Sequence, residues 1–143
     1  MTFLLDTNVI SELRRTRPHG AVLAWRRSVP LHKLVIPAVV IAEIQSGIEI
    51  TRDQNAAKAQ EIEKWLDDVM NYYSILPADG PIFREWARLM AGKSEDLSGD
   101  AMIAATARIH DLTVVTRNVK DFAGLGVEVF NPFAATLGEP VAE

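Results

Sequence analysis

Short apolar runs alternate with longer amphipathic stripes along the chain. The apolar runs are rich in leucine, valine and isoleucine, and they predict strands at residues 3–5, 34–37, 113–116 and 127–130. In the stripes, apolar residues recur every three or four positions, which predicts helices at residues 9–13, 21–29, 39–50, 53–73, 82–90 and 101–110. Strands that alternate with helices indicate an α/β fold, in which helices cover both faces of a parallel sheet.

Three of the predicted helices carry further information. The stripe at 53–73 is the longest amphipathic helix expected in the chain. The helix at 101–110 begins with small apolar residues on nearly all sides, which is typical of a helix buried against a sheet. Gly47 falls inside the helix at 39–50, where a glycine costs about 1 kcal/mol relative to alanine. We therefore expect close packing at Gly47.

The length and composition fit a single globular domain. The chain has 143 residues, 48% of them hydrophobic, which suits one core and leaves little room for two. We expect one domain over residues 1–137 and a flexible tail over residues 138–143. Cysteine is absent, which excludes disulfides, zinc–thiolate sites and cysteine nucleophiles.

No apolar run is long enough to predict a membrane span. The longest covers residues 34–42, whereas a helix that crosses a bilayer needs about 20 apolar residues. The first residues have no basic leader, and Asp6 already interrupts the first apolar run, so they do not resemble a signal peptide. We expect a cytoplasmic protein that is not attached to a membrane.

Charge is distributed unevenly along the chain. The net charge is −4, yet residues 1–42 contain six lysines and arginines against two acids, so the excess of acids lies in the remainder. A basic segment beside an acidic site suits a metal-dependent enzyme that acts on a polyanion, because lysine and arginine neutralise phosphates. The alternative is that these charges belong to ordinary solvated helix faces. The candidate phosphate contacts are Arg14, Arg15, Arg17, Arg26 and Arg27.

Four acids lie at or near the ends of predicted elements. Asp6 follows the first strand directly, and Asp121 follows the strand at 113–116 after a short turn. Asp100 precedes the apolar helix, and apolar residues flank Glu43 on both sides, and both settings favour burial or partial burial. Each acid alone has a structural alternative as a helix cap, a solvated position or a loop residue. An α/β sheet gathers residues from distant strand ends into one crevice, so we expect the four to converge.

Converging carboxylates repel one another unless a cation neutralises them. Sites made of oxygen ligands favour Mg²⁺ or Mn²⁺.

The histidines have no His-x-x-x-His spacing and are expected at the surface: His19, His32 and His110. The tryptophans lie in helical stripes and are expected in the core or an interface rather than as platforms for base stacking: Trp25, Trp65 and Trp86.

Four segments, taken in order, resemble the motifs of PIN-domain ribonucleases. They are Leu-Leu-Asp-Thr-Asn-Val-Ile at 4–10, Ala-Glu-Ile-Gln-Ser-Gly at 42–47, Leu-Ser-Gly-Asp and the apolar run after it at 97–107, and Val-Thr-Arg-Asn-Val-Lys-Asp-Phe at 115–122. Within that family the chain is most similar to the VapC and FitB toxins of bacterial toxin–antitoxin pairs. The resemblance implies a PIN-like α/β/α sandwich with a short, mostly parallel central sheet.

The resemblance also implies roles for individual residues. Asp6, Glu43 and Asp100 match three central acids of the metal site, and Asp121 matches a fourth, more variable one. The polar positions that accompany the site in this family are matched by Thr7, Asn8, Thr116 and Asn118. Direct ligands of one or two Mg²⁺ or Mn²⁺ ions would be Asp6, Asp100 and Asp121. Glu43 would either bind the metal or position the attacking water.

The resemblance further implies an activity and partners. It implies an endoribonuclease that cuts RNA with metal-activated water, with tRNA and rRNA as possible substrates. It also implies a homodimer and a small VapB-like antitoxin, whose apolar helix would lie across the active-site groove.

Two alternatives remain open at this point. A haloacid-dehalogenase-like phosphohydrolase also places an aspartate after its first strand, but it needs a second acid two residues later, where this chain has Asn8. The other alternative is a catalytically silent PIN-fold module that binds RNA or an antitoxin. Activity on a small phosphomonoester would favour the first alternative, and absence of metal-dependent cleavage would favour the second.

Overall fold

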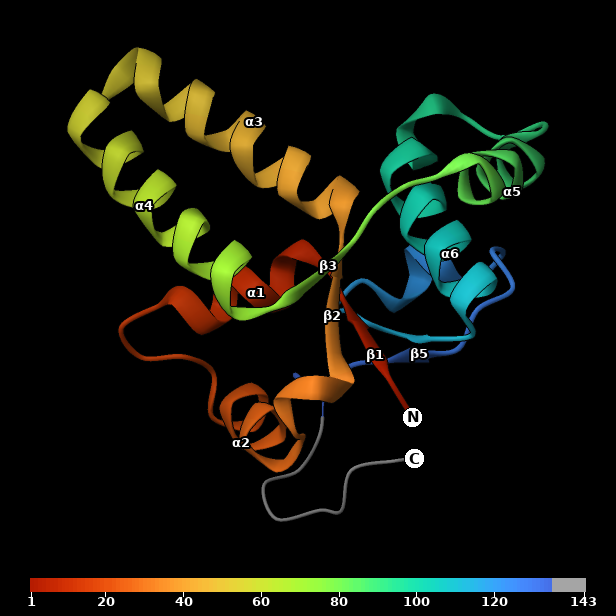
Figure 1. Ribbon diagram of the computed structural model, residues 1–143, viewed down its shortest axis with the longest axis horizontal. Helices are drawn as coiled ribbons and strands as arrows, with labels where there is room; N and C mark the ends of the chain where they lie inside the picture. The colour runs from red at the N-terminus through yellow and green to blue at the C-terminus, as the bar shows by residue number, and fades with distance from the viewer. Residues whose placement is uncertain (135–143) are drawn as a thin grey trace.

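The chain forms one five-stranded sheet flanked by helices, as seen in the computed structural model, which describes residues 1–134 (Figure 1). The predicted tail at 138–143 lies outside the described residues. The strands are β1 (Phe3–Leu5), β2 (Leu34–Pro37), β3 (Ser74–Leu76), β4 (Thr113–Val115) and β5 (Val129–Phe130). Every pairing between them is parallel, so the predicted α/β class is confirmed and the sheet is fully rather than mostly parallel.

Six helices connect the strands within residues 1–134. They are α1 (Thr7–Arg14), α2 (Gly20–Ser28), α3 (Ala38–Gln54), α4 (Ala56–Tyr72), α5 (Gly80–Met90) and α6 (Ser98–His110). Short 3₁₀ turns are η1 (Leu31–Lys33), η2 (Glu95–Leu97) and η3 (Val119–Phe122). None of these helices is long and apolar enough to cross a membrane.

The strand order is β3-β2-β1-β4-β5, which creates a switch point between β1 and β4. The chain first adds β2 and β3 on one side of β1, and then returns to add β4 and β5 on the other side. Figure 1 accordingly shows α1, α3 and α4 on one side of the strands and α5 and α6 on the other, as right-handed crossovers require. In such sheets, ligands bind outside the carboxyl ends of the strands at the switch point. This topology makes the ends of β1 and β4 the expected place for a site.

The core explains why these short strands form. All residues of β1, β2 and β4 are buried, which is why they read as continuous apolar runs rather than alternating ones. The residues from Ala101 to Ala107 in α6 are buried on every side, as the small apolar run predicted. Trp25 of α2 packs edge-on against Phe3, with ring centroids 5.3 Å apart, and covers the sheet near β5.

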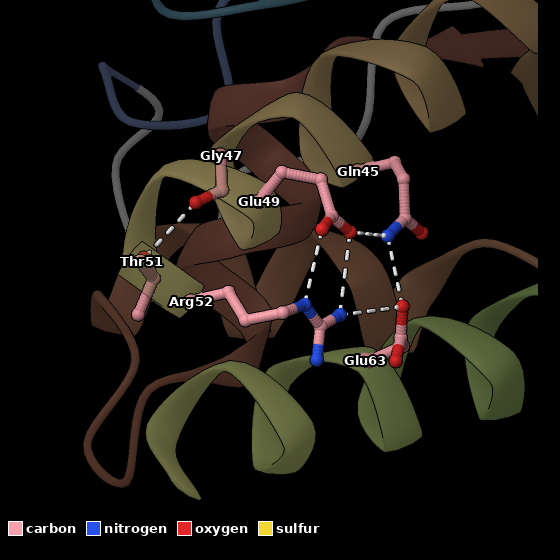
Figure 2. Close-up of polar contacts among 6 residues, drawn as sticks. All are labelled: Gln45, Gly47, Glu49, Thr51, Arg52 and Glu63. Carbon is pink, nitrogen blue, oxygen red and sulfur yellow. Dashed lines mark hydrogen bonds and ion pairs between the residues drawn. The ribbon is translucent and has the colours of Figure 1, made fainter. Parts of the chain in front are cut away.

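The break between α3 and α4 falls later than the sequence pattern indicated. Instead of stopping at 50, α3 continues to Gln54, and Asn55 both ends α3 and caps α4 by accepting a hydrogen bond from the Lys58 amide at 3.0 Å. The two helices are held together by a polar network (Figure 2). Arg52 donates to Glu49 at 3.0 and 3.2 Å and to Glu63 at 3.0 Å. Gln45 donates to the same two acids at 2.7 and 2.8 Å.

Close packing does not account for Gly47, contrary to expectation. A Cβ atom built at this position meets no atom within 4 Å, and the residue is exposed on α3. Its carbonyl accepts a hydrogen bond from the Thr51 hydroxyl at 2.9 Å, as Figure 2 shows, but this contact does not require a glycine.

The strand β3 was not anticipated from the sequence. Its three residues, Ser-Ile-Leu, are half-buried or exposed and form the edge of the sheet. Pairing with β2, in the register of Val35 with Ser74, makes this segment a strand. A run of three residues has too little periodicity to reveal itself before its partner is known.

Candidate active site

Asp6 lies at the switch point, directly after β1. Its side chain is 5% exposed and accepts three hydrogen bonds: from the Thr7 amide at 2.7 Å, the Thr116 hydroxyl at 2.7 Å and the Asn8 amide group at 3.2 Å. Asp6 therefore caps α1 as well as lining the crevice. A carboxylate has about four acceptor positions, so this one retains capacity for a further ligand. Burial raises the pKa of Asp6 more than the hydrogen bonds lower it, and the charge of Asp121 adds to the rise.

Thr116 joins the ends of β1 and β4. It is fully buried, donates to Asp6, and accepts from the Asn8 side chain at 3.1 Å and from the Asn118 amide at 3.0 Å. The side-chain oxygen of Asn8 accepts from the Arg117 amide at 3.0 Å. These bonds fix which end of the Asn8 amide faces Asp6. The polar residues predicted beside the acids thus form one connected network.

Glu43 approaches the crevice from α3. Its carboxylate accepts from the Thr7 hydroxyl at 3.1 Å, and a Cβ atom on Gly99 would lie 3.4 Å from its second oxygen. Full burial is not observed, because Val40 and Ile44 face the core while Glu43 is on the exposed side of the helix. Contact with α6 still removes water from the carboxylate, which raises the pKa of Glu43 despite the bond from Thr7.

Asp100 lies in the first turn of α6 and is half-buried. Burial, followed by the charges of Asp6, Asp121 and Glu43, raises its pKa from 3.8 to about 6. The start of α6 is anchored by Trp86, whose indole donates to the Ser98 carbonyl at 3.0 Å. The helical stripe predicted Trp86 in the core or an interface, but it did not reveal this link to the turn that presents Asp100.

Asp121 lies in η3 and is exposed. Its amide donates to the Asn118 carbonyl at 3.1 Å, which closes the turn after β4. Its charge contributes to the raised pKa values of Asp6 and Asp100, so the three carboxylates lie within electrostatic range of one another. The acids expected to converge therefore interact through their charges. Each of them belongs to a different element of the fold.

A divalent cation fits the chemistry of these four acids. No set of three acidic or histidine side chains within residues 1–134 is already assembled in a metal-binding arrangement. None of the ion pairs in that part of the chain involves Asp6, Glu43, Asp100 or Asp121. The acids offer oxygen ligands that are not neutralised by arginine or lysine, and neighbouring acids contribute to the raised pKa values of Asp6, Glu43 and Asp100. Carboxylate oxygens of this kind suit hard divalent cations.

The arginines proposed as phosphate contacts do not gather at these acids. Arg15 pairs with Glu12 at 3.4 Å, and Arg14 lies 5.7 Å from the centre of the Trp65 ring. Arg26 donates to the hydroxyl of Tyr73, which precedes β3, at 3.2 Å, and so lies toward the amino-terminal edge of the sheet. Arg27 follows it near the end of α2, and Arg17 lies exposed between α1 and α2.

One arginine that the sequence did not single out lies beside the site. Arg117 stands between Thr116 and Asn118, and its guanidinium carbon lies 4.4 Å above the centre of the Phe133 ring. The sequence signal that could have identified Arg117 is its position inside the motif at 115–122, between two polar residues of the site. The histidines are all exposed, as expected: His19, His32 and His110.

Comparisons with known proteins agree with this architecture. The family model described as PIN domain matches residues 3–126. The chain is 36% identical to the toxin FitB of Neisseria gonorrhoeae, with 91% of this chain and 97% of FitB covered. It is 35% identical to the VapC ribonuclease Y4jK of Sinorhizobium fredii, with 91% and 96% covered. The crystal structure of FitAcB from Neisseria gonorrhoeae matches with a TM-score of 0.82 and 34% identity, covering 94% of this chain and 100% of the other.

Proposed function

Because the chain belongs to the PIN-domain family, we propose that it is a metal-dependent endoribonuclease and the toxin of a toxin–antitoxin pair. The observation that carries the proposal is the group of four unneutralised acids at the switch point of the sheet. The names of the relatives, a toxin and a ribonuclease, support the same activity. A haloacid-dehalogenase-like phosphohydrolase does not fit this site, since Asn8 is an amide that donates to Asp6 rather than a second acid.

Three of the acids would bind a metal ion, and the fourth would either bind it too or accept a proton. Asp6, Asp100 and Asp121 are the proposed ligands of Mg²⁺, with Mn²⁺ as the alternative. The bound ion would acidify a water molecule and offset charge on the scissile phosphate. Thr116 and Asn8 hold Asp6 in place by donating to one of its oxygens. Glu43 would complete the ligand set or accept the proton of the attacking water, and its raised pKa suits a general base.

The proposed partners follow from the same family membership. The relative FitB is named a toxin, so we propose a small cognate antitoxin that covers the carboxyl edge of the sheet. A homodimer and a cytoplasmic location belong to the proposal as well. The substrate is RNA, with tRNA and rRNA as the candidate classes.

Cleavage of total RNA in the presence and absence of Mg²⁺ tests the proposal. The wild type should cut only with metal, and Asp6→Asn, Glu43→Gln and Asp100→Asn should each abolish or strongly reduce cutting. Asp111→Asn is the matched control, because Asp111 is exposed at the opposite end of α6 and has φ of 55°, a conformation that asparagine accepts. If all three folded variants cut like the control, the site is wrongly assigned. If the wild type does not cut RNA with metal, the function is wrong.

A further inference from the structure

Arg117 is fixed beside the acids by the backbone but is not bound to them. It directly follows Thr116, whose hydroxyl lies 2.7 Å from Asp6, and its own amide donates to Asn8 at 3.0 Å. Four acids lie on this edge of the sheet, and a guanidinium would ordinarily be drawn to them. Yet none of the ion pairs in residues 1–134 includes Arg117. Arg117 is also not among the causes of the shifted pKa values of Asp6, Glu43 and Asp100.

The face of Phe133 holds the Arg117 side chain instead. The guanidinium carbon lies 4.4 Å above the ring centre, within the range of a cation–π contact. Phe133 follows β5, which lies on the far side of β4 from β1 and Asp6. The stack therefore directs the cation over the end of β5 rather than into the carboxylate crevice.

Phe133 itself is firmly placed. Its amide donates to the Asn131 side chain at 3.0 Å, and its ring packs partly against the core. His19 meets the ring edge-on with centroids 5.4 Å apart. The backbone amide of His19 donates a hydrogen bond to the Glu12 carboxylate at 2.9 Å, and the imidazole of His19 accepts one from the Ala21 amide at 3.2 Å. A ring with these fixed neighbours gives the guanidinium one preferred position.

We propose that Arg117 binds a phosphate of the RNA next to the one that is cut, and that Phe133 is the residue that positions it. This inference rests on the proposed ribonuclease function. Arginine is always charged and presents a planar fork of donors that matches phosphate oxygens. Held away from the acids, it leaves them free for metal and offsets their repulsion of the RNA. A contact to a neighbouring phosphate is present before and during cleavage, so it acts on substrate binding.

Cleavage kinetics of a labelled single-stranded RNA oligonucleotide at several KCl concentrations test the role of Arg117. Arg117→Ala should raise KM about tenfold with a much smaller change in kcat, as expected for a lost charged hydrogen bond to the ground state. The slope of log(1/KM) against log[KCl] should become shallower by about 0.7, the value for one phosphate contact on a single strand. Arg117→Lys should keep the slope but raise KM, because the ammonium has no planar fork to stack or to pair.

Phe133 is tested with two variants that differ in the aromatic ring. Phe133→Leu keeps an apolar side chain and should raise KM, whereas Phe133→Tyr keeps the ring and should behave like the wild type. A thermal melt of each variant shows whether it is folded. If Phe133→Tyr raises KM as much as Phe133→Leu does, the aromatic stack does not position the Arg117 side chain, and the proposed role of Phe133 is refuted.

Lys33→Ala is the control for loss of one positive charge. Lys33 lies in η1, immediately before β2 and hence at the amino-terminal edge of the sheet. If the wild type cuts RNA and Arg117→Ala has the same KM and salt slope as Lys33→Ala, only the assignment of Arg117 fails. If the wild type does not cut RNA at all, the proposed function and this assignment fail together.

Discussion

Asp100→Asn is expected to stabilise the metal-free protein while it removes the activity. In the folded protein, burial and the charges of three other acids raise the pKa of Asp100 to about 6, against 3.8 ordinarily. A group with a raised pKa favours folding when it is protonated. That advantage is complete below about pH 3.8 and is lost as the pH rises through 6. Above pH 6 the ionised carboxylate therefore destabilises the folded protein, and the neutral asparagine removes this destabilisation.

The size of the effect follows from the two pKa values. A rise from 3.8 to about 6 corresponds to about 3 kcal/mol, since one pH unit is worth about 1.36 kcal/mol. Asp100 is only half-buried, so water and salt screen it and roughly 1–1.5 kcal/mol is expected. For a domain of this length, that corresponds to a rise in Tm of about 3–5 °C.

Thermal unfolding in EDTA at pH 7.5 and at pH 4 measures this effect. Asp100→Asn should melt above the wild type at pH 7.5, and the difference should vanish at pH 4, where the wild-type carboxyl of the folded protein is protonated. Added Mg²⁺ should then stabilise the wild type more than the variant, because ligand binding favours the folded state. Asp111→Asn, at the other end of α6, serves as the charge-matched control. A variant that melts at or below the wild type in EDTA at pH 7.5 would refute the electrostatic reasoning.

Two further substitutions test the helix and the network around the site. Gly47→Ala should stabilise the protein by about 0.5–1 kcal/mol in urea unfolding, because α3 has open space there and alanine favours helix; a loss of stability would show an unseen constraint. Thr116→Val should cost about 1–3 kcal/mol, since it leaves the Asn118 amide without its acceptor, the Asn8 side chain without one of two acceptors and Asp6 without one of three donors. Its cleavage rate should fall as well, and a stable, fully active Thr116→Val would contradict the role of the network.

The local pattern of apolar and polar residues was sufficient to predict most of the strands and helices, because burial constrains each of these elements in its own way. A buried parallel strand must be apolar on both faces, so β1, β2 and β4 were visible as short runs. An amphipathic helix must repeat every three to four residues, so the helices were visible as stripes. The positions of Asp6 and Asp100 at element ends were equally readable, because the turn from strand to helix is set by local residues.

Other features depended on residues far apart in the chain. The segment of β3 forms a strand only because it pairs with β2. The break between α3 and α4 lies at Asn55 because its side chain caps α4, although the helical pattern is continuous there. Glu43 is exposed although its neighbours in sequence are apolar, because the orientation of α3 decides which face meets the core. Sequence neighbours do not encode that orientation.

The sequence by itself therefore predicted most of the elements, the acids at their ends and an expected preference for metals that bind oxygen ligands. The tertiary structure decided which of these residues meet. The strand order places the ends of β1 and β4 side by side, so Thr116 binds Asp6 across 110 positions of the chain. The same fold sets Arg117 on Phe133 instead of on the acids. Periodicity is a local property of the chain, whereas contact between distant side chains follows from topology and packing.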